Sequence, residues 1–367
     1  MGANYLLKIL MQNKLQDAVN KLFGDRIISK DLTDAYFNDF IKSGRNKALD
    51  NLEIMKKKPY IDCSTCAYFS LGGGDGAEII EILKKSNISY GILLDIDSKA
   101  TDRAREDWKK LNLPGKDLLI ITGDATQQIR KCRNVLDKYR KDKKIVGVIT
   151  SLQAVLHELP SRSPQFFLHS FLSDIVYDWD PFLLIIREPC PPDGWSEVVQ
   201  IKIPSLPAEE LKFVAEDVKR HMNNFYDLSN KTIGISDKIE GTVHVVGDFV
   251  SMSSILAIET LFKIFYLHDY NYEIEERLTA LNPIGLIQVL EQFNGITCDR
   301  ESFCTESFGR IYRKLKIEAR NSDNPIGRLP MPNPFVRIVA ERLTSFDDNI
   351  EDKYGIPTLP SFYIRRS

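Results

Sequence analysis

Cysteine, net charge and long apolar runs are all scarce in this sequence of 367 residues. Six cysteines are too few for a disulfide framework, which favours a reducing environment. A formal net charge of −2 provides no overall field for a phosphate backbone, so a general nucleic-acid binder is disfavoured, whereas a local basic surface is not. No stretch approaches the roughly 20 apolar residues that cross a bilayer, and no signal-peptide-like stretch follows Met1. We therefore expect a cytoplasmic protein with no membrane partner.

One Cys-x-x-Cys pair is present, formed by Cys63 and Cys66. A structural zinc site needs two further ligands, and the sequence has no second such pair and no His-x-x-x-His. A thioredoxin-like pair should follow a strand and begin a helix, whereas this pair precedes the apolar run 67–71. We therefore expect no metal, and interpret the two cysteines as small, partly buried thiols at the entrance of a strand.

The apolar pattern changes along the chain. Up to about residue 57 apolar side chains recur at helical spacing, and the tract 56–59, with three lysines and a proline, ends that pattern. From about 66 to 190 short apolar runs alternate with amphipathic helical segments. These runs are Tyr68–Leu71, Gly91–Asp95, Leu118–Thr122, Ile145–Thr150 and Phe182–Arg187. They show little polar alternation, as expected for strands covered on both faces. The sequence therefore predicts an α/β, doubly wound, mostly parallel Rossmann-like sheet.

The second half of the chain has a mixed pattern. Helices are expected from Pro207 to His221, from about Ser253 to His268 and over Ile284–Phe293. Short strands are expected at Thr232–Ile235, Thr242–Val246, Ile296–Thr297 and Phe335–Ala340. Residues 344–367 are polar and contain prolines, so we expect them to be loosely ordered.

A glycine-rich loop, Gly72-Gly73-Gly74-Asp75-Gly76, lies between the first predicted strand and a helix that begins near Ala77. Glycine lets the chain turn sharply at the end of a strand and lets the backbone approach a ligand closely. The N-terminus of the helix adds unpaired amides and the positive end of its dipole. Because the loop lies at a strand-to-helix junction, it predicts nucleotide binding and not merely a surface turn.

Polar residues follow each of the next three strands. Asp95 ends the second strand about 19 residues after the loop, close to the spacing at which an acid accepts the ribose hydroxyls of a nucleotide. The alternative role of Asp95 is to cap the next helix, but Asp97 or Ser98 is better placed for that. Asp124 follows the third strand and can accept from an adenine amino group, with a turn or cap as the rival role. The tract 150–153 follows the fourth strand. All of these positions are carboxyl ends of parallel strands, where open α/β sheets bind ligands.

This ordered series resembles the class I S-adenosylmethionine-dependent methyltransferases over roughly residues 67–190. In that family the glycine loop holds the methionine end of the cofactor, the acid after the second strand binds ribose, and the acid after the third contacts adenine. The resemblance implies a cofactor-binding set of Ser70, Gly72, Gly74, Gly76, Asp95, Ile96, Asp124, Ala125, Ser151 and Leu152. The tight Gly-x-Gly-x-Gly spacing favours S-adenosylmethionine over a dinucleotide. The family often has an acid where Ser70 stands, and Asp75 can compensate for it in part.

The resemblance also implies a division of the chain. It gives an N-terminal helical lid (1–60), an S-adenosylmethionine-binding core (61–194), a helical insertion or substrate cover after the fifth strand (195–280), completion of the core (281–345) and a tail (346–367). The sheet should have seven strands and end with an antiparallel strand, for which Phe335–Ala340 is the candidate.

Three residues are candidates for catalysis. The tract 155–160 looks like the stretch after the fourth strand in many small-molecule methyltransferases, and it contains His157 and Glu158. Glu188 follows the fifth strand. Methyl transfer needs alignment and exclusion of water, and it needs a base only when the acceptor loses a proton. The alternative for the His-Glu pair is helix capping and surface charge.

The sequence thus predicts a methyltransferase whose acceptor is a small organic molecule. Two alternatives stay open. Lys and Arg crowd residues 130–144, which would suit a macromolecular acceptor such as tRNA or protein, so nucleic acid is not excluded. Asp137 and Asp142 interrupt that tract, and a solvated crossover helix explains it more simply. The other alternative is a non-catalytic scaffold that binds S-adenosylmethionine. Ser70, which stands where the family often has an acid, favours this alternative.

Overall fold

The structure, a computed structural model, describes residues 32–142, 144–162, 168–176, 181–190, 197–224, 238–265 and 277–305, and shorter stretches between 309 and 342. Up to residue 190 strands and helices alternate as the apolar pattern predicts. The elements are α2 (Leu32–Lys56), the short 3-10 turn η2 (Cys63–Thr65), β1 (Cys66–Leu71), α3 (Ala77–Lys85), β2 (Tyr90–Asp95), α4 (Ser98–Leu111), β3 (Asp117–Thr122), α5 (Ala125–Lys141), β4 (Gly147–Gln153), α6 (Glu158–Arg162), α7 (Leu168–Val176) and β5 (Phe182–Pro189).

The main sheet has seven strands in the order β3-β2-β1-β4-β5-β11-β9, where β9 is Ile296–Phe303 and β11 is Phe335–Arg342. The pairs from β3 to β5 are all parallel, and β11 is antiparallel to both β5 and β9. The predicted doubly wound, seven-stranded Rossmann-like sheet with an antiparallel strand is therefore confirmed. The parallel strands end at one edge, which we call the carboxyl edge.

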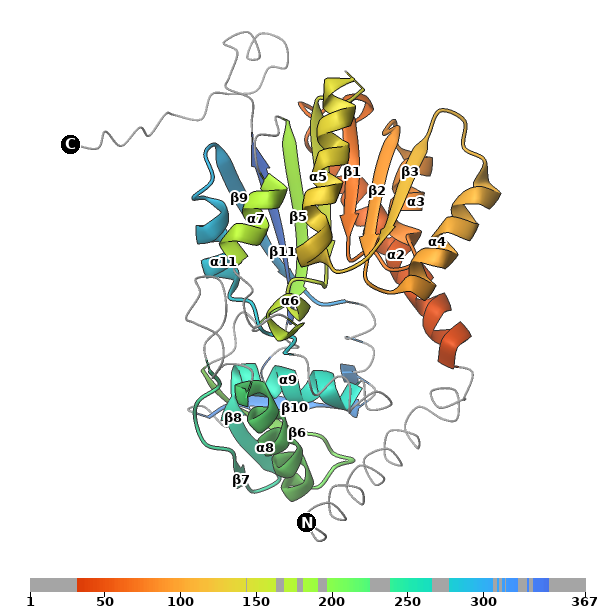
Figure 1. Cartoon of the computed structure of the whole chain (residues 1–367). Coiled ribbons are helices and arrows are strands. Elements are labelled where there is room, and N and C mark those ends of the chain that lie inside the picture. Colours follow the sequence, from red (N-terminus) through yellow and green to blue (C-terminus); the bar gives the residue numbers. More distant parts are fainter. Residues whose placement is uncertain are drawn as a thin grey trace, which may run out of the picture.

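Helices cover both faces of this sheet (Figure 1). Apolar residues of α2, α3 and α4 pack on one face, and those of α5, α7 and the later helix α11 (Pro283–Leu290) pack on the other. All six residues of β1 and all seven of β4 are buried. This explains why the strand sequences lack polar alternation. Of the helices described, none has the length and apolar character needed to cross a membrane.

The insertion after β5 contains a second sheet as well as the expected helices. Its elements are β6 (Val198–Lys202), α8 (Ala208–Asn224), β7 (His244–Val246), β8 (Phe249–Ser253), α9 (Ser254–Phe265) and, much later in the chain, β10 (Glu318–Asn321). The strand order is β10-β6-β8-β7, and every pair is antiparallel. Strand–helix–strand–strand–helix–strand with this order is a ferredoxin-like arrangement. The insertion faces the end of the main sheet from which α6 emerges (Figure 1).

Element boundaries differ from the sequence prediction in several places. β4 begins and ends later than the run 145–150, and β9 continues to Phe303. The strands β6, β8 and β10 were not predicted, because each is only four or five residues long and pairs with partners far along the chain. Since β10 joins the small sheet, the segment expected to complete the core contributes to both sheets. The strand expected at 232–235, the helical pattern before residue 32 and the tail lie outside the described residues.

The cysteine pair lies where the sequence places it. Cys63 is half-buried in η2, and Cys66 is buried as the first residue of β1. Burial raises the pKa of Cys66 to about 12, so its thiol is protonated at neutral pH and unreactive. Among the described residues no group of three or more His, Cys, Asp or Glu side chains could hold a metal ion.

Candidate functional site

The glycine loop turns from β1 into α3 through three left-handed residues. Gly72, Gly74 and Gly76 have φ values of 66°, 55° and 74°, which residues other than glycine rarely adopt. The Gly72 amide donates to the Leu94 carbonyl at 2.8 Å, which ties the loop to the end of β2. A Cβ on Gly72 would lie 2.6 Å from the Val155 Cγ2, so the loop packs directly against the segment after β4. These glycines are therefore required by conformation and by close packing.

Asp95 joins the end of β2 to this loop. One carboxylate oxygen accepts from the Gly74 amide at 2.7 Å, and the other accepts from the Asp97 amide at 2.8 Å. The neighbouring Ile96 is 49% exposed, an unusual state for an apolar side chain at the end of a buried strand. An acid and an exposed apolar side chain thus lie together beside the loop.

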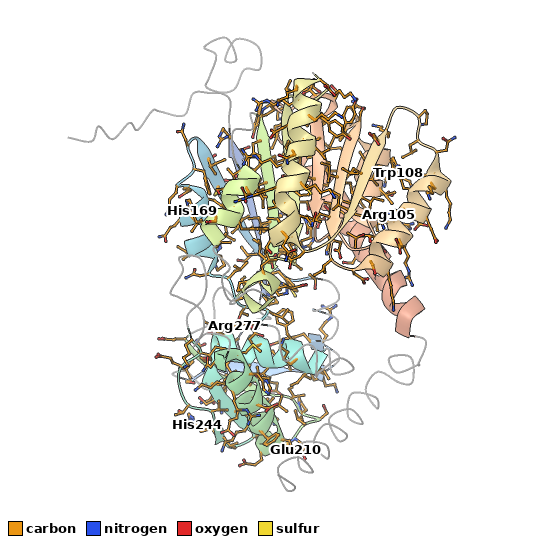
Figure 2. All side chains as sticks on the ribbon, in the orientation of Figure 1. Arg105, Trp108, His169, Glu210, His244 and Arg277 are labelled. Carbon is orange, nitrogen blue, oxygen red and sulfur yellow. The ribbon has the colours of Figure 1, made fainter. Side chains whose placement is uncertain are left out.

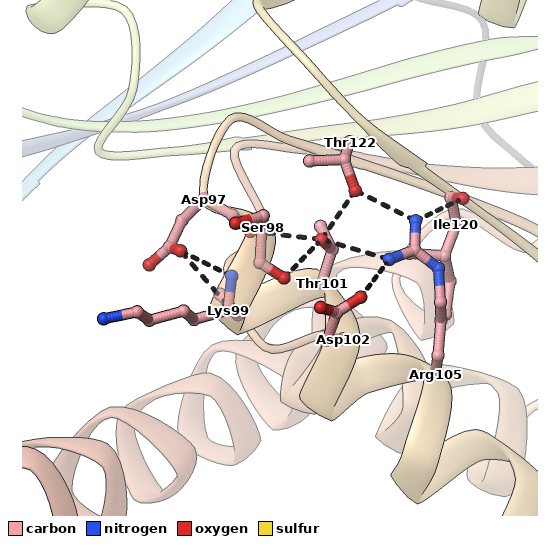
Figure 3. A network of polar contacts seen from close by, with 9 residues as sticks. Asp97, Ser98, Lys99, Thr101, Asp102, Arg105, Ile120 and Thr122 are labelled. Carbon is pink, nitrogen blue, oxygen red and sulfur yellow. Dashed lines mark hydrogen bonds and ion pairs between the residues drawn. The ribbon is translucent and has the colours of Figure 1, made fainter.

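The end of β3 is fixed by α4 (Figure 3). The hydroxyls of Thr101 and Thr122 lie 2.7 Å apart, and Arg105 donates to Thr122 Oγ1 at 2.9 Å and to the Ile120 carbonyl at 3.2 Å. Asp97 accepts from the Lys99 amide and caps α4, as the sequence predicts. This network holds the third strand end rigidly beside Asp95.

Asp124 begins α5 directly after β3. One of its oxygens, Oδ1, accepts from both the amide and the hydroxyl of Thr126, at 2.7 and 2.6 Å, so the residue has the capping role that the sequence offered as a rival. The second oxygen takes no part in these two bonds. Ala125 is half-buried beside it.

Three residues of the predicted cofactor set lie beneath the carboxyl edge. Ser70, Ser151 and Leu152 are at most 1% exposed. Ser70 and Ser151 are register partners across β1 and β4. Among the described residues the Ser70 hydroxyl has no hydrogen-bond partner, and a Cβ on Gly73 would lie 2.4 Å from it. Ser70 therefore supports the loop from below.

Two of the three catalytic candidates form a buried pair. The Nδ1 atom of His157 lies 2.7 Å from Glu188 Oε2, and the other carboxylate oxygen accepts from the amides of Val155 and Leu156 at 2.8 Å each. Glu188 is fully buried and His157 is 3% exposed. Both oxygens of Glu188 are thus committed to holding the segment 155–157. Glu158 begins α6 and is only half-buried.

A polar cluster on the opposite face of the sheet brings α2 to the same edge. Asn51 Nδ2 donates to Tyr68 OH at 2.9 Å, to Glu78 Oε1 at 3.1 Å and to Ser151 Oγ at 3.3 Å. The Tyr68 hydroxyl donates to Glu78 at 2.5 Å, and Gln153 Nε2 donates to Ser151 Oγ at 2.9 Å. These five residues are all buried, and they come from α2, β1, α3 and β4.

Charge is concentrated around this cluster. Burial lowers the pKa of the Lys47 ammonium, and the nearby carboxylates of Glu78, Glu188 and Asp75 act against that shift. Burial raises the pKa of Asp75, whose carboxylate accepts from the Ala77 amide at 3.1 Å. Burial and the charge of Glu78 raise the pKa of Tyr68 well above its ordinary value, so the phenol keeps its proton. Two cations, Lys47 and Arg187, and several carboxylates therefore lie close enough to act on one another around this cluster.

Comparison with known proteins gives matches only among solved structures. No protein-family model and no curated protein matches the sequence. A SAM-dependent methyltransferase from Archaeoglobus fulgidus is 15% identical, over 80% of this chain and 93% of that one, at a TM-score of 0.37. The magnesium protoporphyrin IX methyltransferase of Synechocystis PCC 6803, crystallised with SAH, is 12% identical over 92% and 98% of the two chains, at a TM-score of 0.40. A plantazolicin methyltransferase in complex with SAH is 9% identical over 92% and 99%, also at 0.40.

At such identities and TM-scores the likeness says nothing about the site or the family. The sheet order, with one antiparallel strand next to the last, is independent of these matches. The main sheet has the doubly wound, Rossmann-like order on its own evidence. Within it the glycine loop, Asp95 and Asp124 follow β1, β2 and β3 in the order that the sequence predicts.

Sequence reasoning missed the contribution of α2 and α3 to the edge. Asn51 lies in a segment assigned only as a lid, and its partner Ser151 is 100 residues away, so no local spacing could connect them. Glu78 looks like an ordinary acid in the first turn of a helix. Gln153 ends a predicted motif but had no role assigned. Only its burial beside a polar cluster distinguishes it.

Proposed function

We propose that this protein binds S-adenosylmethionine at the carboxyl edge of its main sheet and transfers the methyl group to a small organic molecule. The observation that carries the proposal is the hydrogen bond from the Gly74 amide to Asp95. It joins a loop of left-handed glycines to an acid at the end of the adjacent strand, which is the arrangement that a nucleotide with a ribose diol needs.

The residues at the edge fit such a cofactor. Asp95 ends β2 beside the glycine loop, where an acid can accept ribose hydroxyls, and the exposed side chain of Ile96 offers an apolar surface for a base. Asp124 retains one carboxylate oxygen outside its capping bonds. Bound S-adenosylmethionine would supply an activated methyl group, so the protein needs to contribute alignment and exclusion of water and little covalent chemistry.

The surroundings of the edge support a small acceptor. α2 packs on one face of the main sheet and the insertion faces the carboxyl edge (Figure 1), and Arg277 lies in the insertion on the side nearer that edge (Figure 2). The insertion is joined to the main sheet by apolar contact, since Phe262 of α9 packs edge-on against Phe335 of β11 with ring centres 5.6 Å apart. Arg130 and Arg133 of the basic tract form ion pairs with Asp174. Because part of its charge is paired within the protein, the tract gives little support for a macromolecular acceptor.

His157 is the residue we propose as a base if the acceptor must lose a proton. Its Nδ1 faces Glu188, which would stabilise the imidazolium that forms when the ring takes a proton. Because Glu188 is fully engaged with His157 and two backbone amides, its role is to position this segment. Glu158 stays a weaker candidate.

Calorimetric titration with S-adenosylmethionine and S-adenosylhomocysteine tests the cofactor. Asp95→Ala should weaken binding by about 100-fold or more, because it removes a partly buried acceptor and leaves the Gly74 amide without it. Asp117→Ala is the matched control. Asp117 begins the adjacent strand at the opposite edge and is exposed, so binding should be unchanged. Absence of binding by the unaltered protein would contradict the proposal.

Transfer of a labelled methyl group into a cell extract, separated by molecular size, tests the acceptor. Label in the small-molecule fraction is the expected result. Label in RNA or protein would replace the small acceptor by a macromolecular one. Firm cofactor binding with no label in any fraction would leave a scaffold that binds the cofactor without turnover.

A further inference from the structure

Two cations lie on the α2 side of the carboxyl edge, and Lys47 is the first of them. It follows Gly44 by three residues and precedes Asn51 by four, so the three lie on one face of α2. A Cβ on Gly44 would lie 2.9 Å from Ala77 Cβ, at the start of α3. Asn51 donates to Ser151 Oγ at 3.3 Å, near the end of β4. Lys47 therefore lies between the helix that follows the glycine loop and the end of β4.

Arg187, near the end of β5, is the second cation and lies on the same face of the sheet. Leu183 and Ile185 of β5 pack with apolar residues of α2, and Arg187 follows them at the same period of two. Its Nη1 donates to Asp50 Oδ2 at 3.0 Å. Because Asp50 comes three residues after Lys47 in α2, Arg187 reaches this helix within one turn of Lys47.

The two positive charges act on one another. Burial lowers the pKa of Lys47, and the charge of Arg187 also lowers it. The acids that act on Lys47 each accept hydrogen bonds from other groups, and they are Asp75, Glu78 and Glu188. Both cationic side chains are half-buried, so both keep access to a ligand. Like charges in a partly buried place are stabilised by an anion that binds beside them.

Aromatic side chains adjoin Arg187. Its guanidinium carbon lies 4.3 Å from the centre of the Phe303 ring, and Phe303 stacks on Phe335 with ring centres 5.7 Å apart. Phe335 is level with Pro189 at the end of β5 and with Phe303, so both rings lie at the carboxyl edge, where they are half-buried. Phe335 in turn contacts Phe262 of the insertion. A flat apolar surface therefore extends from Arg187 towards the insertion.

We propose that the methyl acceptor is an organic acid, whose carboxylate binds Lys47 and Arg187 and whose flat apolar part packs on Phe303 and Phe335. A guanidinium has five N–H donors, so Arg187 can hold Asp50 and a second carboxylate together. An acceptor in this place lies between the glycine loop and the insertion, as alignment with a methyl group held by the loop requires. The inference rests on the proposed methyl transfer and specifies the class of its acceptor.

Anion exchange of the small-molecule fraction of a cell extract, done before the transfer assay, tests this class. The methyl-accepting activity should be retained at about pH 7 and should pass through at about pH 2.5, where a carboxylate is protonated and a phosphate ester keeps a charge. Accepting activity that is not retained at the higher pH overturns the inference. Retention at both pH values also overturns it, because the acceptor would then be a stronger acid than a carboxylic acid.

Lys47→Gln and Arg187→Gln test the two cations, and Lys58→Gln is the matched control. Lys58 is also a partly buried lysine, but it pairs with Glu341, which is level with the beginning of β5 at the opposite edge of the sheet. Thermal unfolding shows whether each variant is folded, and calorimetry with S-adenosylhomocysteine measures the cofactor site. Transfer of label to the retained acidic fraction measures use of the acceptor. If Arg187→Gln does not fold, Lys47→Gln decides the outcome.

We expect both cation variants to bind S-adenosylhomocysteine within about threefold of the unaltered protein and to lose about tenfold or more of the transfer, the effect of one charge-assisted hydrogen bond. The loss should shrink as the acidic fraction is concentrated, because affinity for the acceptor is what falls. Lys58→Gln should keep both properties.

Unchanged transfer by the folded cation variants overturns the inference. An equal loss of cofactor affinity and transfer also overturns it, since the cations would then serve the cofactor. Transfer to a neutral acceptor refutes the inference alone and leaves methyl transfer standing. Failure of the unaltered protein to bind the cofactor or to label any fraction refutes the proposed function itself, and the inference with it.

Discussion

Replacement of Gly72 by alanine gives the sharpest test of how the site is built. Alanine in the left-handed conformation, at φ of 66°, costs about 1–2 kcal/mol. Its Cβ would also lie 2.6 Å from Val155 Cγ2 and 2.8 Å from Val155 Cβ. Overpacking of this kind costs about 1–3 kcal/mol. Because the Val155 amide is bonded to the buried Glu188, the segment cannot move freely out of the way. We therefore expect Gly72→Ala to lower the free energy of unfolding by about 2–5 kcal/mol.

Equilibrium denaturation in urea measures this loss, and Gly115→Ala provides the control. Gly115 also has a left-handed φ, of 74°, but nothing lies within 4 Å of a Cβ placed on it. That variant should show the conformational cost alone, about 1–2 kcal/mol. Affinity for S-adenosylhomocysteine should fall for Gly72→Ala and stay unchanged for Gly115→Ala. An equal loss of stability in the two variants would refute the close packing of the glycine loop on Val155.

Three other substitutions have defined outcomes. Burial raises the pKa of Asp75 above its ordinary 3.8, so the stability that this group contributes falls as pH rises through the window from 3.8 to the raised value. Asp75→Asn should remove that part of the pH slope in urea denaturation series. An unchanged slope would contradict the burial. A Cβ on Gly44 would lie 2.9 Å from Ala77 Cβ, so Gly44→Ala should speed hydrogen exchange in α2, although alanine favours a helix by about 1 kcal/mol. Protection equal to that of the unaltered protein would argue against close contact of α2 and α3. Glu188→Leu removes the acceptor of both His157 and the two backbone amides, so denaturation should show a loss of about 1–3 kcal/mol, and a neutral result would exclude the positioning role.

The sequence alone was sufficient for the main sheet and for the part of the site that lies on it. Short apolar runs alternate with helices, and each polar position follows directly from the strand before it. For that reason the order of the residues is enough to place the glycine loop, Asp95 and Asp124 at one edge of the sheet. The capping role of Asp97 is also readable locally, because a cap and its helix are adjacent in the chain.

Contacts between distant segments were decided only by the tertiary structure. No spacing in the sequence joins Asn51 to Ser151, or shows that Glu188 bonds to a segment 31 to 33 residues earlier. The small sheet was hidden for the same reason, since β10 pairs with β6 across more than 100 residues of chain. Local pattern determines which face of an element is apolar, whereas the packing of those faces determines which polar side chains meet.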